Sequence, residues 1–346
     1  MDVDTKVTVV IPCFNTANTL ERCWNSLKVQ TIGIKNLQCI FVDDASTDGG
    51  ETWKCLQEIE GEYPDQVVII HLEKNMKQGG ARNAALSYAT GKYLQFLDAD
   101  DALVPYMLEK LYQLAEQHHS EIIQFNHYFD FNSERVLQKN SKENQFHIVD
   151  ENCRRRLLQG DLLNCGCWNK FYSMEFVRST GSRFAEYCIY EEPLFVYPLF
   201  LYLKRYMTIT DALYIYYVHP GSTATSHLAS SILDHPNVQL KTLQRCMKEP
   251  ALYQKYRDDI ALYFLWTFAG ETVLWSVEKE GAVLPLDYFR EMQNVCQSLF
   301  PDWHEIAVKN RWNKALVELF KESQQAFESQ EKLDVWTRKI LSILER

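Results

Sequence analysis

The hydrophobic positions of residues 1–120 follow two alternating patterns. Continuous apolar runs, typical of strands buried on both faces, occupy residues 7–11, 39–42, 67–70 and 93–97. Segments with the spacing of helices follow each run, beginning near residues 18, 49, 79 and 105. Strands that alternate with helices predict an α/β fold, in which a mostly parallel sheet is covered by helices on both faces.

Short polar signals predict where these helices begin. Asn18, with Glu21 three residues later, matches the capping pattern of a first helix. Ser46 or Thr47 is expected to cap the second helix, and Pro105 to open the fourth.

The middle of the chain is less regular. A strand is expected over residues 122–129, followed by a polar hairpin or loop over residues 130–147. The remaining expected elements are helices over residues 151–159, 173–179 and 191–203 and strands over residues 207–209 and 213–218.

Strand patterns stop near residue 228. Long helical patterns then cover residues 228–247, 251–279, 285–299 and 305–344. We therefore expect two parts: an α/β domain over residues 1–226, with halves 1–120 and 121–226, and a helical C-terminal region over residues 227–346.

Composition narrows the classes of protein that fit. The net charge is −10, which argues against a nucleic-acid-binding protein because such proteins carry a basic surface. No apolar run is long enough for a transmembrane helix, and no secretory signal is recognisable. The ten cysteines are scattered without a CxxC pair, so we expect reduced thiols and a cytoplasmic location.

Polar segments follow the first two apolar runs, at the strand ends where open α/β sheets bind ligands. The first contains Pro12, Phe14 and Asn15, and by itself matches an ordinary turn. The second contains Asp43 and Asp44, whose carboxylates can accept hydrogen bonds from a nucleotide base or a ribose. The alternative is that acids and hydroxyls of this segment only cap the next helix.

A third segment, at the start of the third helix, has the composition of a phosphate site. Gly79 and Gly80 permit close approach of a backbone, and Arg82 follows them at the N-terminus of the expected helix. Neither a P-loop nor a GxGxxG pattern is present.

The fourth segment places three acids within four residues. Asp98 and Asp100 are two residues apart, so in an extended chain their side chains lie on one side. Carboxylates this close repel one another unless a cation lies between them, and their hard oxygens suit Mg²⁺ or Mn²⁺. A solvated acidic turn is the alternative. Asp101 points away and is expected to cap the helix near Pro105.

In this order and spacing, the four segments resemble glycosyltransferase family 2, which has the GT-A fold. Weaker likenesses follow in the middle of the chain, and together they cover about residues 5–226. Lys77 stands where the family usually has a glycine, and Gly79-Gly80 are expected to supply the flexibility. The matching segments are Pro12-Cys13-Phe14-Asn15, Val42–Asp48, Ala81-Arg82-Asn83, Phe96–Asp101, Cys167–Tyr172, Glu191–Phe195 and His219–Ser222.

The resemblance implies transfer of a sugar from a nucleotide-sugar, most often a UDP-sugar, with inversion at the anomeric carbon. It implies Mn²⁺ or Mg²⁺ held by Asp98 and Asp100, and His219 could complete the metal shell. Lys170 is expected to be structural. The positions implied to bind the donor are Pro12, Phe14, Asn15, Asp43, Asp44, Gly79, Arg82, Asp98 and Ala99.

The family's general base is an aspartate, and Glu192 stands at that position. Glutamate keeps the carboxylate but is one methylene longer, and a small misplacement of a reacting group is costly. Three options follow: Glu192 is the base, Glu191 replaces it, or activity is lost. We favour Glu192 as the base, with Glu191 positioning the acceptor. From these two residues alone, acids complementing a helix dipole would explain the pair.

The expected partners are a nucleotide-sugar donor and a glycan or lipid-linked glycan acceptor of a bacterial cell surface, with no nucleic acid. Peripheral contact with the inner face of the membrane, or a homodimer, is left open for the helical C-terminal region. Two other functions stay open: a non-catalytic nucleotide-sugar-binding scaffold, and a sugar nucleotidyltransferase, although the glycine-rich loop of the latter is replaced by residues 12–15.

Overall fold

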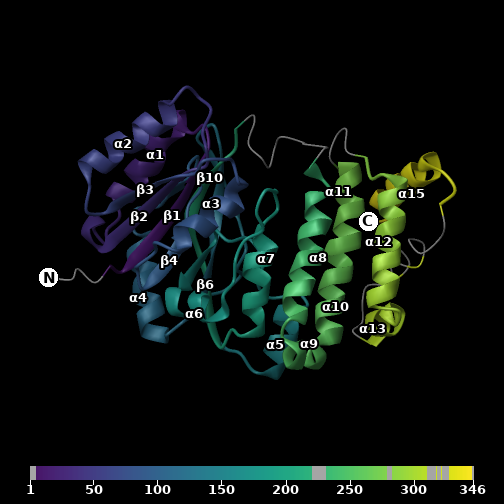
Figure 1. Ribbon diagram of the computed structural model, residues 1–346. Coiled ribbons are helices and arrows are strands. Elements are labelled where there is room, and N and C mark those ends of the chain that lie inside the picture. Colours follow the sequence, from purple (N-terminus) through teal and green to yellow (C-terminus); the bar gives the residue numbers. More distant parts are fainter. Residues whose placement is uncertain are drawn as a thin grey trace. The chain divides into compact units, whose positions relative to one another are not determined.

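The computed structural model describes residues 5–219, 231–278, 283–309, 317, 321 and 327–344 (Figure 1). The chain divides into two compact units. The first consists of Met1–Arg154 and Leu162–Pro220, and the second of Arg155–Asp161 and Gly221–Arg346. The expected boundary at residue 226 lies outside the described residues and stays a prediction.

The first unit is built on one mixed sheet, in which the strand order is β3-β2-β1-β4-β9-β6-β10-β5. The four predicted strands of its first half are confirmed, and they pair in parallel. Their bounds are β1 Val7–Cys13, β2 Leu37–Asp43, β3 Val67–His71 and β4 Tyr93–Phe96.

The second half of the sheet departs from the predicted pattern. Strand β9 (Lys170–Ser173), which was not predicted, lies antiparallel between β4 and β6 (Ile122–Phe131). The two strands expected over residues 207–218 form one strand, β10 (Arg205–Tyr217), whose pairing with β6 shifts register between Thr208 and Tyr214. The short strands are β5 Ala102–Leu103, β7 Glu134–Gln138 and β8 Gln145–Ile148.

Helices join these strands. The expected helix over residues 191–203 divides into a short α-helix and a 3-10 helix. The helices of this unit are α1 Ala17–Lys28, η1 Ile34–Asn36, α2 Glu51–Glu62, α3 Lys77–Leu86, α4 Met107–His118, α6 Met174–Thr180, α7 Glu192–Val196 and η2 Tyr197–Leu201.

Two of the predicted helix caps are wrong. Thr16, not Asn18, precedes α1, and its side chain makes no capping bond. At α2 the carboxylate of Asp48 accepts the Thr52 backbone N–H at 3.0 Å, whereas Ser46 accepts from Asn15 in another loop. Hydroxyl groups in these loops therefore hold neighbouring loops together instead of capping the next helix.

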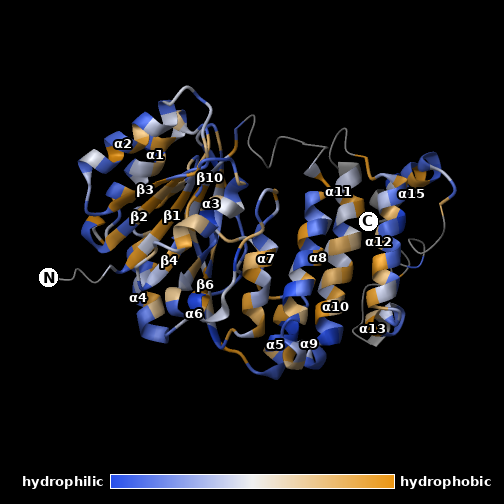
Figure 2. Cartoon of the chain, viewed as in Figure 1, coloured by the Kyte–Doolittle hydropathy of each residue, from blue (hydrophilic) through white to orange (hydrophobic). Residues whose placement is uncertain are grey.

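The sheet of the first unit separates two apolar layers. Odd-numbered residues of β1, such as Val9 and Ile11, belong to a core cluster with Leu20 of α1 and Leu56 of α2. Val10 points to the opposite face because side chains alternate along a strand, and α3 packs against β1. Figure 2 accordingly shows β1 and β2 as largely hydrophobic, with mixed colouring on α1 and α2.

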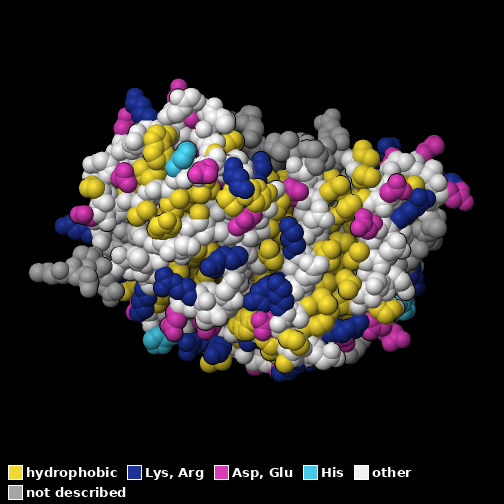
Figure 3. All heavy atoms as spheres, in the orientation of Figure 1, with side chains coloured by type: hydrophobic (Ala, Val, Ile, Leu, Met, Phe, Trp, Pro, Cys, Tyr) yellow, Lys and Arg dark blue, Asp and Glu magenta, His cyan; other side chains and the backbone are white. Residues whose placement is uncertain are grey.

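The second unit is helical in its described part. Helix α10 (Arg257–Leu265) is buried over most of its length, and a π-helical turn (η4, Trp266–Glu271) continues it. Figure 3 shows hydrophobic side chains gathered along α10 and α11 on the face in view. The other helices are α5 Glu151–Leu158, whose last residues belong to this unit, α8 Asp234–Met247, α9 Pro250–Lys255, α11 Thr272–Glu278, α12 Leu286–Leu299, α13 Trp303–Lys309 and α15 Gln330–Leu344.

Among the described helices of both units, none combines the length and apolar character that crossing a bilayer requires.

Candidate active site

The loops that follow β1 and β2 are joined by hydrogen bonds. The Asn15 backbone N–H donates to Ser46 Oγ at 2.9 Å, and the Thr47 N–H donates to Asn15 Oδ1 at 2.7 Å. Phe14 leaves 43% of its surface exposed. The segments after β1 and β2, which were both predicted to bind the nucleotide-sugar, therefore adjoin at the carboxyl ends of the parallel strands.

Asp43 and Asp44 are both buried, and each carboxylate is bound within the protein. Asp43 accepts from the Ser46 N–H at 3.1 Å and lies 2.8 Å from His71 Nδ1. Asp44 accepts the backbone N–H of Met76 at 2.7 Å, so it holds the start of α3. Burial raises the pKa of Asp44 to about 6.

Lys77 shows why a glycine is usual at its position. Its φ is +62°, a left-handed conformation that is unfavourable for residues with a Cβ. Gly79 does not supply the flexibility that we expected. A Cβ added at Gly79 would lie 1.9 Å from the Ala185 carbonyl oxygen and 2.9 Å from Glu191 Cγ. Gly79 is therefore needed for the close approach of the segment that carries Glu191.

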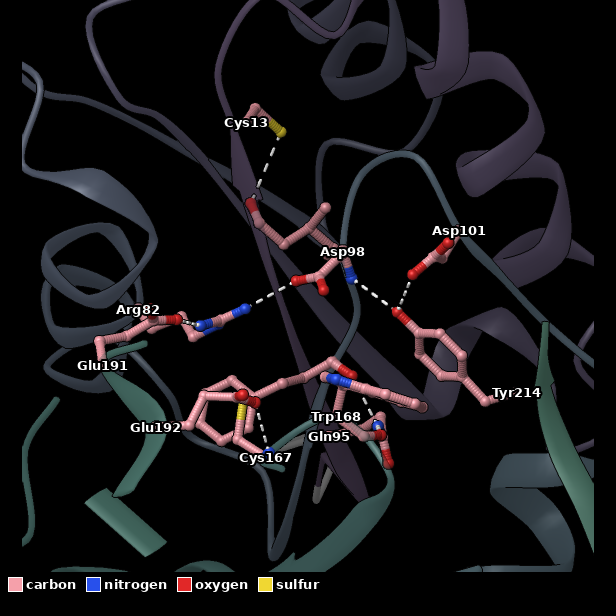
Figure 4. A network of polar contacts seen from close by, with 12 residues as sticks. Cys13, Arg82, Gln95, Asp98, Asp101, Cys167, Trp168, Glu191, Glu192 and Tyr214 are labelled. Atoms are coloured by element: carbon pink, nitrogen blue, oxygen red, sulfur yellow. Dashed lines mark hydrogen bonds and ion pairs between the residues drawn. The ribbon is translucent and has the colours of Figure 1, made fainter. Parts of the chain in front are cut away.

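Arg82 lies between two acids (Figure 4). Its guanidinium donates to Asp98 Oδ1 at 2.7 Å and to the carboxylate of Glu191 on the other side. The arginine side chain is buried, and its Nε has no hydrogen-bond partner among the described residues. Arg82 belongs to the third predicted segment and Asp98 to the fourth. The guanidinium therefore joins these two segments to each other and to Glu191.

The charges of this group do not balance, because one guanidinium faces two carboxyl groups, of which Glu191 is buried and Asp98 is 25% exposed. Burial raises the pKa of Glu191 to about 7, against the lowering effect of Arg82. Burial also raises the pKa of Asp98, and Asp100 adds repulsion. The site therefore retains a proton in a pH range where an exposed carboxyl group is ionised.

Asp101 does not cap the helix near Pro105, so that prediction is wrong. Helix α4 begins at Met107, and the Asp101 side chain turns into the protein instead. It accepts from the Tyr214 hydroxyl at 2.7 Å and from the Tyr217 N–H at 2.8 Å. Tyr214 Oη also accepts the Asp98 N–H at 3.1 Å, so the tyrosine ties the acidic segment to β10.

The predicted metal ligands divide into two groups. Asp100 Oδ2 lies 3.0 Å from His219 Nε2, and both side chains are partly exposed. Asp98 faces Arg82 instead, and no group of three or more His, Cys, Asp or Glu side chains in the described ranges is arranged to hold a metal ion. The Asp100 carboxylate suits Mn²⁺ or Mg²⁺, whereas the His219 imidazole is an acceptable ligand for Mn²⁺ but not for Mg²⁺. Residues 220–222 of the predicted His-Ser segment lie outside the described residues.

Glu191 and Glu192 have different surroundings. Glu191 is 6% exposed and bound to Arg82. Glu192, at the start of α7, is half-buried, and its Oε1 accepts the Cys167 backbone N–H at 2.7 Å. Tyr190, just before the pair, has a φ of +63°. Such strain in a bulky residue is most often found at functional sites.

Several residues of this site were not predicted. Tyr214 and His71 contact predicted residues, but nothing in their local sequence distinguishes them. Cys167 lies in a segment that matches the family, but the contact of its amide with Glu192 was not predicted. Each comes from a strand or loop distant in sequence from its partner. A contact that depends on strand register cannot be derived from local patterns.

Comparisons with known proteins agree with this geometry. The family described as Glycosyl transferase family 2 matches residues 8–181. The chain is 26% identical over 276 residues to the cholesterol galactosyltransferase of Borreliella burgdorferi, covering 75% of this chain and 72% of that protein. It is 25% identical over 284 residues to the minor teichoic acid biosynthesis protein GgaB of Bacillus subtilis, covering 81% of this chain but only 30% of GgaB.

A solved structure shares the fold. S. aureus TarS 1–349 in complex with UDP superposes with a TM-score of 0.70 at 18% identity, covering 98% of this chain and 91% of that one. The GT-A fold predicted from the sequence is thereby confirmed. The likeness also includes the helical part, for which sequence motifs gave no relative.

Proposed function

Because the chain belongs to glycosyltransferase family 2, we propose that it transfers a sugar from a UDP-sugar to a hydroxyl group of a glycan or lipid-linked glycan, with inversion. The observation that carries this proposal is the group formed by Arg82, Asp98 and Glu191. It joins the donor segments to the segment of the family's base. Family membership also favours a glycosyltransferase over a nucleotidyltransferase.

The donor would bind over the loops that follow β1, β2 and β4. The exposed Phe14 and the adjoining Pro12 and Asn15 would contact the nucleotide, with Asp43 and Asp44 below them. Gly79, Asp98 and Ala99 would line the sugar and diphosphate. We assign Arg82 to holding the carboxyl groups of Asp98 and Glu191, in addition to its predicted contact with phosphate.

The proposed metal is Mn²⁺ or Mg²⁺, with Asp100 and His219 as ligands and Asp98 as the third predicted ligand. The carboxylate oxygens fit both cations, and the imidazole fits Mn²⁺ better than Mg²⁺. When bound, the cation would neutralise charge on the diphosphate leaving group.

Glu192 is the proposed general base. A base must reach the acceptor hydroxyl, and Glu192 is the more accessible of the two glutamates. Glu191 is buried and already binds Arg82, which suits it to positioning. Its raised pKa alone does not make it the base, because its carboxylate is already bound by Arg82.

The proposals for the acceptor and for the cellular location have less support than the proposal for the donor. The relatives named above act on cholesterol or in teichoic acid biosynthesis, so we propose an acceptor at the bacterial cell surface. None of the ten cysteines, all of which lie in the described ranges, forms a disulfide, which fits the reducing cytoplasm. Membrane contact or a homodimer through the helical region stays a prediction.

Isothermal titration with UDP tests the donor and metal assignments together. We expect binding that requires Mn²⁺ or Mg²⁺ and is lost in Asp100→Ala, while Asp65→Ala, an exposed aspartate, binds as the wild type does. Tight binding without metal that Asp100→Ala leaves unchanged would overturn the metal assignment.

A further inference from the structure

Lys170 is a fully buried cation whose partners all lie in one loop. The side chain is 0% exposed. Its Nζ donates to Asn164 Oδ1 at 2.6 Å, to the Gly166 carbonyl at 2.7 Å and to Asn169 Oδ1 at 2.9 Å. These bonds use all three donors of an ammonium group. Burying an ammonium group is expensive unless it is fully hydrogen-bonded, so these contacts fix the conformation of residues 164–169.

The same loop holds the amide that binds the proposed base. The Cys167 N–H donates to Glu192 Oε1 at 2.7 Å. The other side of this residue is also fixed, because the Cys167 carbonyl accepts from the Tyr172 hydroxyl at 3.1 Å. The Cys167 amide is therefore a rigid donor, held through the loop that Lys170 organises.

The length of Glu192 explains why such a donor is needed. A glutamate is one carbon–carbon bond longer than the family's aspartate and has one more rotatable bond. Without a fixed partner, its carboxylate would occupy several positions, and few of them would suit proton abstraction.

We propose that Lys170 is a positioning residue for Glu192. By binding three oxygens of residues 164–169, it holds the Cys167 amide where the longer glutamate side chain can reach it. The loop thereby fits a glutamate to the work that an aspartate does elsewhere in the family. This inference rests on the proposed function, since it takes Glu192 as the base.

The charge of Lys170 sets a pH limit on this arrangement. Burial lowers the pKa of Lys170 to about 8. Its three hydrogen-bond acceptors are neutral, and the ionisable groups acting on it are Cys165, Glu192 and Cys167. Above about pH 8 the ammonium loses a proton and with it one of the three bonds that hold the loop.

Hydrogen–deuterium exchange tests the positioning without requiring activity. In the full-length protein, the Cys167 amide should exchange slowly. Glu192→Asp, which is too short to reach it, should accelerate exchange at Cys167 alone. Lys170→Met should accelerate exchange throughout residues 164–169. Lys35→Met, the same change at an exposed lysine, is the control and should leave these amides unchanged.

Kinetics test whether the positioning of Glu192 affects turnover. The probe reactions are the release of UDP from UDP-glucose, UDP-galactose and UDP-N-acetylglucosamine, with water as the acceptor. Lys170→Met should lower kcat on the order of 100-fold, with little change in the donor KM. Glu192→Asp should also lower kcat, although aspartate is the family's residue. The double variant should be no worse than the poorer single variant, because both changes remove one interaction.

The outcomes separate the two proposals. If the wild type releases UDP and Lys170→Met matches Lys35→Met in exchange and in kcat, the positioning role is wrong. Independent, additive losses in the double variant would also overturn it. If the wild type releases no UDP from any donor, the proposed function fails, while the exchange experiment still decides whether Lys170 holds the loop. Should Lys170→Met not fold, hydrogen exchange of the wild type below and above pH 8 replaces it. Loss of protection at residues 164–169 above pH 8 would support the role of the ammonium group, and unchanged protection would contradict it.

Discussion

At the scale of single residues, the site depends on how one buried guanidinium is shared. Arg82 binds the partly exposed Asp98 and the buried Glu191, and one positive charge cannot neutralise two carboxylates. A proton on Glu191 removes the excess negative charge, as the raised pKa of this residue indicates. This arrangement could not be predicted from the sequence, from which we expected Arg82 to bind phosphate and Glu191 to position the acceptor.

The first prediction concerns the pH dependence of stability. The pKa of Glu191 rises from 4.5 to about 7 on folding. The stabilisation linked to its proton is therefore complete below pH 4.5 and is lost as the pH rises through about 7. Glu191→Gln removes this titration, so the free energy of unfolding should vary less between pH 5 and pH 7 than in the wild type. Urea denaturation across this range measures it.

The control for that experiment is Glu73→Gln, at an exposed position. It should keep the pH dependence of the wild type. Equal pH dependence in Glu191→Gln and the wild type would contradict a raised pKa at Glu191.

The second prediction concerns the close packing at Gly79. Gly79→Ala would put a Cβ 1.9 Å from the Ala185 carbonyl oxygen, so the backbone beside Glu191 must move. We expect a loss of about 1–3 kcal/mol in the free energy of unfolding. Gly61→Ala in α2 is the matched control, because its added Cβ meets nothing within 4 Å. The control should gain about 0.5–1 kcal/mol. Similar urea midpoints for the two variants would refute the packing argument.

At the scale of elements, buried strands were predictable and their partners were not. Four continuous apolar runs identified β1 to β4 because a buried parallel strand must be apolar on both faces. Strand β9 has only four residues, and its place between β4 and β6 depends on pairing with distant segments. The predictions of the helix-capping residues were wrong for a related reason, because side chains such as Ser46 form hydrogen bonds with another loop.

The third prediction tests the hydrogen bonds by which Asp48 holds the first turn of α2, whose N-cap residue is Gly50. Asp48 accepts from the Thr52 backbone N–H and, at 2.6 Å, from the Thr52 hydroxyl. Asp48→Ala should therefore lower the free energy of unfolding by about 1 kcal/mol. Asp65→Ala, an exposed aspartate outside the helices, serves as the control and should have little effect. Equal urea midpoints for both variants would argue against stabilisation of α2 by Asp48.

At the scale of the whole molecule, the two units differ in what they offer to catalysis. The sequence-predicted site residues of the described ranges all lie in the first unit, on strand ends, on loops and in the first turns of helices. The second unit has its own buried centre in α10 and its own buried acid. Asp259 there binds Arg155 at 2.8 Å and Gln159 at 2.6 Å. This contact explains why the end of α5 belongs to the helical unit.

A fourth prediction follows for that unit. Asp259→Ala leaves Arg155 and Gln159 without this acceptor and should cost about 1–3 kcal/mol in the free energy of unfolding. The control is Asp161→Ala, because Asp161 is exposed. Asp334 is unsuitable, since its carboxylate accepts a hydrogen bond from Gln330. An Asp259→Ala protein as stable as Asp161→Ala would show that the contact contributes little.

Release of UDP from a panel of UDP-sugars, measured with Mn²⁺ for the wild type and for Glu192→Gln, tests the central claim most directly. The account predicts turnover of at least one donor by the wild type. It predicts a loss of about 10²- to 10⁴-fold in Glu192→Gln, since the amide cannot accept a proton, with UDP affinity unchanged. A wild type that turns over none of the donors, or a Glu192→Gln variant as active as the wild type, would contradict it.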